Sequence, residues 1–304
     1  MSNEVKVAII GLDTSHSVAF PRLMQAPDCP AELKVEGLRA ASCLRFPTPF
    51  TTEETLDRQQ QQLEEWGIKV TTVFDEAVAD CDAIMIEIND PACHLEYFTK
   101  CADFGKPIFL DKPMADNIKN GRAIYDLAKA KGLRVFSASS LRHVRELSEA
   151  CAQMPSPLFV STYGPLGKAP AGSWIVWYGV HAFEMLQRAI GRGAKSVFAH
   201  KDKAGAVAVV EYEDNRHGVV ELMENGHSYA GCLRGEKDVF PFVVDMRWAY
   251  TMQMREVARF FAGAEPPLTL EDTLEVTAML DAAECSTQTG RAVQIADLQR
   301  QEVR

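Results

Sequence analysis

The chain has no hydrophobic run approaching the roughly 18–20 residues that a membrane-spanning helix requires. Its first residues also lack the apolar stretch of a secretory signal peptide, because charged and polar side chains lead almost at once into a β-rich run. Both absences predict a cytoplasmic protein with no membrane partner.

Clusters of basic residues are missing as well. The net charge of −10 comes from 42 acidic and 32 basic residues, and the basic residues are not gathered in one segment. A nucleic-acid surface needs clustered lysine and arginine to neutralise phosphates. We therefore expect no nucleic-acid partner.

Patterned metal ligands are also absent. The eight cysteines include no C-x-x-C pair, and the seven histidines form no H-E-x-x-H pattern. Zinc ribbons and disulfide scaffolds both depend on closer or patterned spacing. We predict no metal, and we expect most of the cysteines to be reduced side chains of the interior.

The first part of the chain alternates β-rich runs with helical patterns. The predicted strands cover 5–10, 34–38, 69–73, 83–88, 107–110 and 134–137. The predicted helices cover 15–25, 52–66, 91–104 and 116–131. Such alternation is typical of a doubly wound parallel sheet. Residues 1–138 are therefore predicted to form a Rossmann-type α/β domain.

The pattern changes in residues 139–304, where β-rich runs follow one another with turn residues between them. The predicted strands cover 158–163, 196–200, 206–212, 218–223 and 239–244. The predicted helices cover 141–153, 179–189, 250–262 and 270–289. This pattern favours an α+β domain with a large, mainly antiparallel open sheet.

A glycine turn follows the first predicted strand, where a Rossmann domain carries G-x-G-x-x-G for the cofactor diphosphate. Only Gly11 fits that pattern, because Asp13 and His16 stand at the second and third glycine positions. Thr14, Ser15 and His16 offer side-chain donors instead. An ordinary capped strand-to-helix turn is the alternative interpretation.

Two further segments are candidates for contact with the cofactor. Ser42 and Arg45 suit the 2′-phosphate of NADP, although a surface loop fits these residues equally well. Asn89 and Asp90 follow a predicted strand, at the edge where open α/β sheets bind ligands. His94 either faces the cofactor or caps the next helix.

Asp111 and Lys112 follow a buried run directly, and Pro113 then turns the chain away. A lysine beside a bound nicotinamide can hold a substrate hydroxyl, and desolvation can let it accept a proton. The alternative is a surface lysine that pairs with Asp111. The residues alone do not decide between the two.

These segments together resemble the glucose–fructose oxidoreductase / inositol dehydrogenase / MocA (Gfo/Idh/MocA) family, in a divergent bacterial branch. The resemblance rests on the order of the glycine turn, the segment 90–94, the segment 105–113 and the segment 179–184, and 111–113 is similar to the E-K-P motif. It implies NAD or NADP as cofactor and a sugar, polyol or related substrate. It also implies homodimers or homotetramers.

The resemblance also implies roles for single residues. Lys112 matches the active-site lysine and His181 the acid/base histidine, while Arg142 and Glu184 match positions near the substrate. The alternative interpretation of His181 is a histidine of the protein core whose polar atoms are satisfied there. Asp111 and Lys112 complete the set of cofactor-binding candidates.

One position departs from the family pattern. Trp177 stands where many relatives have an aspartate that completes a Lys/Asp/His set. A tryptophan can stack on a ring but cannot relay a proton, so we expect Trp177 to contact the substrate. We expect the same of its neighbour Tyr178. Three functions stand at this point: an NAD(P)-dependent oxidoreductase, an NAD(P)-using lyase or glycosidase without net redox change, and a non-catalytic ligand sensor.

Overall fold

The structure, a computed structural model, describes residues 4–300. Its chain divides into two compact units. Unit 1 comprises 1–111, 123–137 and 250–270, and unit 2 comprises 112–122, 138–249 and 271–304. Compared with the predicted boundary at 138/139, unit 1 gains the segment 250–270 and unit 2 gains the segment 112–122.

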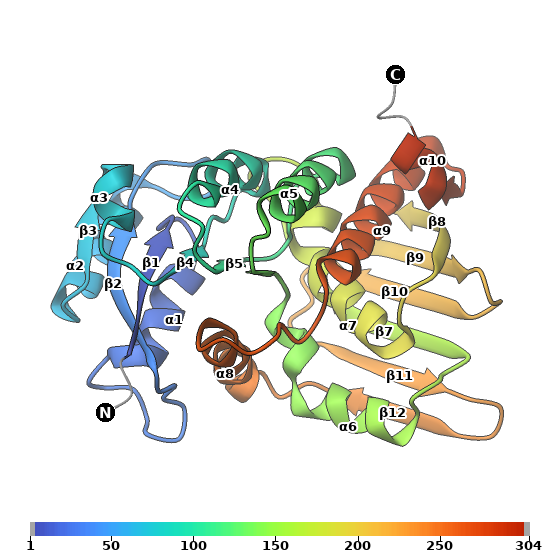
Figure 1. The fold of residues 1–304 in the computed structure, drawn as a ribbon. Helices are drawn as coiled ribbons and strands as arrows, with labels where there is room; N and C mark the ends of the chain where they lie inside the picture. The colour runs from blue at the N-terminus through green and yellow to red at the C-terminus, as the bar shows by residue number, and fades with distance from the viewer. Residues whose placement is uncertain (1–3, 301–304) are drawn as a thin grey trace. The chain divides into compact units, whose positions relative to one another are not determined.

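Unit 1 is built on a six-stranded parallel sheet with the order β3-β2-β1-β4-β5-β6 (Figure 1). Its strands are β1 Val5–Ile10, β2 Leu38–Leu44, β3 Lys69–Thr71, β4 Ala83–Ile86, β5 Ile108–Leu110 and β6 Val135–Phe136. The order reverses between β1 and β4. Ligands of doubly wound sheets bind at such a point, outside the carboxyl ends of the strands.

Each helix of unit 1 has an apolar face, which is buried when the helix packs against this sheet. They are α1 His16–Gln25, α2 Glu53–Glu65, α3 Phe74–Val78, α4 His94–Ala102, most of α5 Ile118–Lys131 and most of α8 Ala249–Phe261. β4 and β5 are buried at every position. Continuous burial is expected of strands that have helices on both faces.

The second strand lies further along the chain than predicted. The structure places β2 at Leu38–Leu44 rather than at 34–38, and its residues Leu38 to Leu44 pair with β1. The β2 sequence is LRAASCL, which contains no β-branched residue. Its strand propensity is therefore weak, and pairing with buried neighbours determines its position. Ser42 thus belongs to a strand and not to a loop.

Unit 2 contains a seven-stranded sheet with the order β12-β11-β7-β10-β9-β8-β13. Its strands are β7 Phe159–Pro165, β8 Ala194–Lys201, β9 Gly205–Tyr212, β10 His217–Met223, β11 Ala230–Arg234, β12 Val239–Val243 and β13 Val293–Gln294. β7 and β10 pair in parallel and the other pairs are antiparallel. The mainly antiparallel sheet predicted for this part is confirmed.

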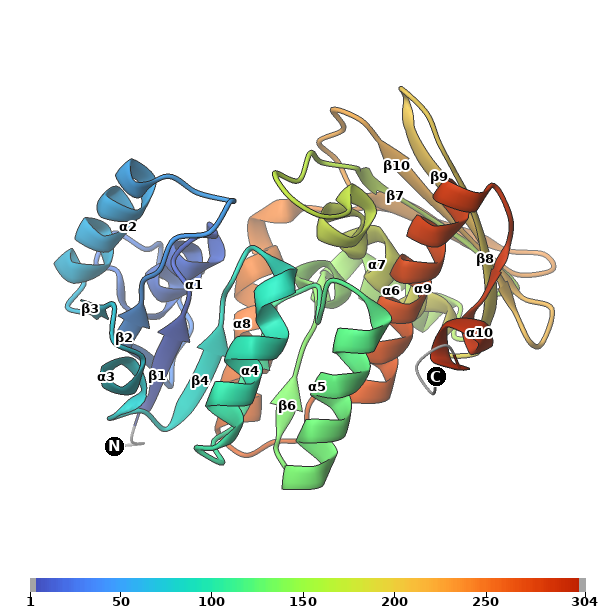
Figure 2. The same ribbon diagram turned by 90° about the horizontal axis from the view of Figure 1, so that it is seen from above.

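Within residues 4–300, helices cover one face of this sheet and leave the other face open. The helices of the unit include α6 Arg145–Gln153, α7 Val180–Ile190, most of α9 Leu270–Thr289 and α10 Ile295–Arg300. Figure 2 shows α7 and α9 along one side of β8–β10. In β9, Ala206, Ala208 and Val210 are buried while Val207 is exposed, as this arrangement requires.

A π-helical turn, Ile175–Gly179, precedes α7, although the sequence predicts only a helix from 179. Such turns are rare and occur frequently at functional sites. Within residues 4–300, no helix combines the length and the apolar character needed to cross a membrane.

Candidate functional site

The glycine turn lies at the carboxyl end of β1. Gly11 has a φ of +108°, and a Cβ at this position would collide with the backbone carbonyl of Glu87 after β4. Only glycine tolerates this conformation and this approach without strain. The chain then enters α1, whose first turn has no acidic residue and no capping side chain. The His16 N–H donates to the Thr14 hydroxyl, but the helix dipole still favours an anion at this end.

The carboxylate of Asp13 is held by protein groups. Oδ2 accepts a hydrogen bond from the Thr48 hydroxyl at 2.6 Å, and Oδ1 accepts one from the backbone N–H of Asn89 at 2.9 Å. Burial raises the pKa of Asp13 above its ordinary value, and these two hydrogen bonds oppose the rise. Asp13 therefore joins the loops after β1, β2 and β4.

Thr14, Ser15 and His16 differ in what they offer to a cofactor. Ser15 is exposed, whereas Thr14 is buried and its hydroxyl oxygen accepts from the backbone N–H of His16 at 3.3 Å. The His16 ring is directed to Asp111, with Nδ1 2.7 Å from Oδ2. The start of α1 and the Ser15 hydroxyl fit a diphosphate, because the helix dipole favours an anion and the hydroxyl can donate to it.

Ser42 and Arg45 make contacts within unit 1. The buried Ser42 hydroxyl donates to the backbone carbonyl of Ala77. The Arg45 guanidinium forms ion pairs with Glu53 at 2.7 Å and Asp57 at 2.6 Å. Both side chains therefore have partners within the protein, and their contacts give no support to a preference for NADP.

The segment after β4 is held by backbone contacts. Asp90 caps the short helix Pro91–Cys93 by accepting from the N–H of Ala92. Buried His94 lies with Nε2 2.8 Å from the backbone carbonyl of Ile88. The Nε2–H of the ring donates to this carbonyl, as expected for a structural histidine. Asn89 and Asp90 are both half-buried.

Lys112 is the second residue after β5, which ends at Leu110. Its side chain is 8% exposed, and its ammonium forms no hydrogen bond or ion pair within residues 4–300. Its chain neighbour Asp111 pairs with His16 instead. The interpretation of Lys112 as a surface lysine paired with Asp111 is therefore wrong. A buried ammonium is costly unless a polar group approaches it.

His181 lies in unit 2, in the first turn of α7. Its Nδ1 is 2.6 Å from the hydroxyl oxygen of Ser139, which also accepts from the backbone N–H of Leu141. Two aromatic rings meet the imidazole edge-on, Tyr178 at 5.3 Å and Tyr229 at 5.6 Å. The ring is thus fixed in orientation as well as buried.

Arg142 and Glu184 form a buried ion pair with each other. Nη1 of Arg142 lies 2.9 Å from Oε2 of Glu184, and Nη2 donates to Gln187. Both charged side chains are nearly inaccessible, at 7% and 2% exposure. Burial raises the pKa of Glu184, and Arg142 opposes that rise. The pair joins the segment 140–143 to α7, so its charges are directed at each other rather than at a substrate.

Trp177 and Tyr178 lie on the π-helical turn before α7 and are half-buried. Their rings contact each other at 5.1 Å. Gly167, in the glycine- and proline-rich loop before this turn, packs so closely on Tyr178 and Trp177 that a Cβ there would come within 2.8 Å and 3.1 Å of their side chains. The loop therefore lies against these aromatic residues.

Several partners were not predicted from the sequence. Ser139 was not among the predicted site residues, although its place shortly after β6 is a signal for a ligand-facing residue. The sequence carries no local signal for Tyr229, Gln187 or the pairing of His16 with Asp111, because each contact joins distant segments.

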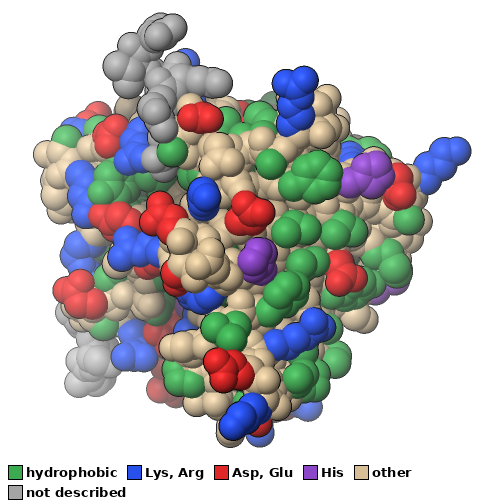
Figure 3. Space-filling model, turned by 90° about the vertical axis from the view of Figure 1, so that its right-hand side faces the viewer, with side chains coloured by type: hydrophobic (Ala, Val, Ile, Leu, Met, Phe, Trp, Pro, Cys, Tyr) green, Lys and Arg blue, Asp and Glu red, His purple; other side chains and the backbone are tan. Residues whose placement is uncertain are grey.

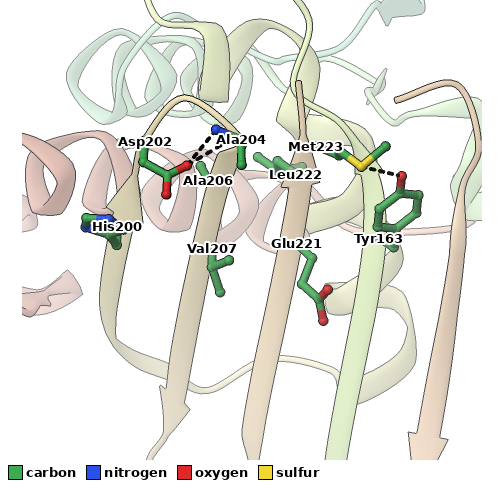
Figure 4. A pocket seen from close by; sticks show the side chains of 10 residues that line it. Tyr163, His200, Asp202, Ala204, Ala206, Val207, Glu221, Leu222 and Met223 are labelled. Carbon is green, nitrogen blue, oxygen red and sulfur yellow. Dashed lines mark hydrogen bonds between the residues drawn. The ribbon is translucent and has the colours of Figure 1, made fainter. Parts of the chain in front are cut away.

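A shallow pocket on unit 2 lies elsewhere on the sheet. Figure 4 shows Tyr163, Glu221 and Met223 beside Val207 and the β8–β9 turn, where Asp202 accepts from the N–H groups of Ala204 and Gly205. Neither Lys112 nor His181 lines it. The pocket therefore does not belong to the candidate site.

The sheet order and the glycine turn define unit 1 as a dinucleotide-binding Rossmann fold. Residues 5–139 match the family model GFO_IDH_MocA, described as an oxidoreductase family with an NAD-binding Rossmann fold. This match covers less than half of the chain, and it agrees with the resemblance stated above; NAD is the cofactor of the fold that the family model describes.

Solved structures share the fold over nearly the whole chain. Scyllo-inositol dehydrogenase from Lactobacillus casei aligns with a TM-score of 0.79 at 15% identity, covering 97% of this chain and 99% of that one. Myo-inositol 2-dehydrogenase from Lactobacillus plantarum aligns at 0.78 and 13%, covering 96% and 99%. An oxidoreductase from Agrobacterium radiobacter, in complex with NAD+, L-tartaric acid and magnesium, aligns at 0.77 and 14%, covering 97% and 100%. A comparison with curated protein sequences finds no match.

Proposed function

We propose that this chain is an NAD(P)-dependent oxidoreductase that interconverts a carbohydrate-like alcohol, such as a sugar or polyol, and its ketone. The observation that carries the proposal is the buried Lys112 side chain just beyond β5, on a Rossmann fold that matches the model of an NAD-binding oxidoreductase family. Two of the similar structures are inositol dehydrogenases, which supports a polyol as substrate.

Lys112 holds the reacting oxygen in this proposal. An ammonium group donates up to three hydrogen bonds, and burial strengthens each of them because the local dielectric is low. Such a donor stabilises the negative charge that develops on the oxygen of an alcohol as its proton leaves.

His181 takes the proton. Ser139 Oγ already accepts from a backbone N–H, and it can accept from Nδ1–H of His181 as well. The neutral ring then carries its lone pair on Nε2, which is the form needed for a general base. Many relatives have an aspartate at the position of Trp177, and its carboxylate can orient the histidine. In this chain the uncharged Ser139 hydroxyl orients the His181 ring instead.

The bound nicotinamide supplies the hydride acceptor or donor. The first turn of α1, with Gly11 and Ser15, holds the diphosphate of the cofactor in this proposal. Asn89 contacts the cofactor at the adjacent strand end. Arg142 and Glu184 act as positioning residues, because their ion pair fixes the helix that carries His181.

A panel of sugars and polyols, each with NAD+ or NADP+, tests the function through the absorbance of reduced nicotinamide. Formation of reduced cofactor in proportion to oxidised product is expected. Product without net reduction would instead establish the lyase or glycosidase alternative. Saturable cofactor binding without any conversion across the panel would favour the ligand sensor.

We also propose that the open face of the unit 2 sheet mediates homodimer or homotetramer formation. Exposed apolar side chains on it are Phe198, Val207, Met223, Val239 and Val243, between 46% and 70% exposed. Figure 3 shows hydrophobic side chains gathered on this side. Exposed apolar patches of this kind mark interaction sites. Light scattering of wild type and of the Val207→Glu variant tests the proposal, and a monomeric wild type would contradict it.

A further inference from the structure

A buried histidine–carboxylate cluster in unit 1 plays no part in the chemistry above. His16 begins α1, Glu87 follows β4 and Asp111 follows β5. Nδ1 of His16 lies 2.7 Å from Oδ2 of Asp111 and 3.9 Å from Oε2 of Glu87. All three side chains are at most 7% exposed.

Two aromatic rings fix the plane of the His16 imidazole. Phe20 stacks on it with ring centres 4.8 Å apart, and Tyr250 meets it edge-on at 5.1 Å. A ring held in this way keeps Nδ1 toward Asp111, and the Nδ1–H donates to the carboxylate.

The same three side chains place one ligand atom each within 4.8 Å of one another, which is compatible with a metal ion. The geometry favours a hydrogen bond. At 2.7 Å, the His16 proton occupies the space between Nδ1 and Asp111 that a metal ion would need. A zinc ion held by both atoms would instead lie about 2.0–2.2 Å from each.

We propose that His16 is a positioning residue for Lys112, because it engages the Asp111 carboxylate that would otherwise pair with the lysine next to it in the chain. This inference rests on the proposed function insofar as Lys112 binds the substrate oxygen. Opposite charges in a low-dielectric setting attract strongly. An ammonium paired with Asp111 would stay protonated and would have one donor fewer for a substrate.

The rate of acetylation of Lys112 by acetic anhydride at pH 8, measured by peptide mass spectrometry, tests this without substrate or cofactor. Exposed Lys119 in the same sample is the internal reference. In His16→Gln the amide no longer lies at the Nδ1 position, and the Lys112 rate should fall about fivefold or more. In His16→Asn the amide nitrogen replaces Nδ1, and the rate should stay within about twofold of wild type.

A double variant separates positioning from general damage to the fold. His16→Gln combined with Asp111→Asn removes the carboxylate, so the Lys112 rate should return to within about twofold of wild type. An unchanged rate in His16→Gln, or no recovery in the double variant, would overturn the proposal. Stoichiometric Zn²⁺ binding that His16→Gln abolishes would also overturn it, in favour of a metal site.

This labelling pattern is independent of turnover. If the pattern is found and no substrate is converted, then the proposed oxidoreductase function fails while the positioning of Asp111 by His16 stands.

Discussion

The glycine turn of unit 1 and the His181 region of unit 2 hold their polar groups in different ways. Around the turn, Asp13 and His94 bond mainly to backbone groups and loop side chains. Around His181, a buried ion pair, a hydroxyl and aromatic rings join whole elements. The first arrangement leaves a helix N-terminus available to a ligand, and the second fixes one imidazole. We infer that cofactor binding and proton transfer are supported by separate sets of contacts.

The largest effect is expected on turnover, and it separates the contacts that bind the cofactor from those that support the chemistry. Replacing Lys112 with alanine removes the donor to the reacting oxygen, and turnover should fall by about 10²–10⁴-fold while cofactor affinity changes little. Steady-state kinetics and a cofactor titration measure both quantities. Lys119→Ala, an exposed lysine of α5, is the matched control and should behave as wild type. Full turnover in the Lys112 variant would remove the residue from the site.

The next largest effect is expected on the free energy of unfolding, when the buried ion pair of Arg142 and Glu184 is broken. Arg142→Leu leaves the Glu184 carboxylate buried without its partner, and this should lower the free energy of unfolding by about 3–5 kcal/mol. Urea denaturation checks it. Arg145→Leu removes an exposed pair with Glu149 and should cost at most about 0.5 kcal/mol. Equal losses in the two variants would show that the buried pair does not fix α7.

A smaller change is expected when the imidazole loses its hydroxyl partner. Ser139→Ala removes the hydrogen bond that orients His181, which becomes charge-assisted when the ring is protonated. A loss of about 1.5 kcal/mol corresponds to about tenfold in kcat. KM should change little, and Ser139→Thr should restore most of the rate. A shift confined to KM would indicate a substrate contact instead.

The smallest effect is expected in the glycine turn. Burial raises the pKa of Asp13 above its ordinary 3.8, so its stabilising contribution is complete below that pH and is lost as the pH rises through the folded-state value. Asp13→Asn should therefore gain stability relative to wild type with increasing pH. It should also bind NAD+ about fivefold more tightly at pH 7, because about 1 kcal/mol of repulsion is removed. Melting temperatures from pH 3 to 8 and calorimetry test both, and weaker binding would count against the account.

The sequence predicted the parts of the fold that depend on continuous burial. β1, β4 and β5 are apolar runs, and their alternation with helices defined the parallel sheet. The strand β11, with the sequence AGCLR, has no β-branched residue and was missed. The π-helical turn was missed because its apolar residues have the same pattern as an α-helix.

For the candidate site, the sequence proposed residues but not the partners that the structure gives them. Lys112 and His181 stand in motifs that predict their places. Arg142 pairs with Glu184, 42 positions away, and Asp111 pairs with His16, 95 positions away. Both contacts depend on how the elements pack. The local sequence around each residue does not predict such contacts.

Calorimetric titration of the wild-type chain and of Lys112→Ala with NAD+ and NADP+ tests whether the chain binds a nicotinamide cofactor through contacts that do not depend on Lys112. The account predicts saturable binding of at least one cofactor, with dissociation constants for wild type and variant that agree within about twofold. Absence of binding to both cofactors, or loss of binding in the Lys112 variant, would contradict it.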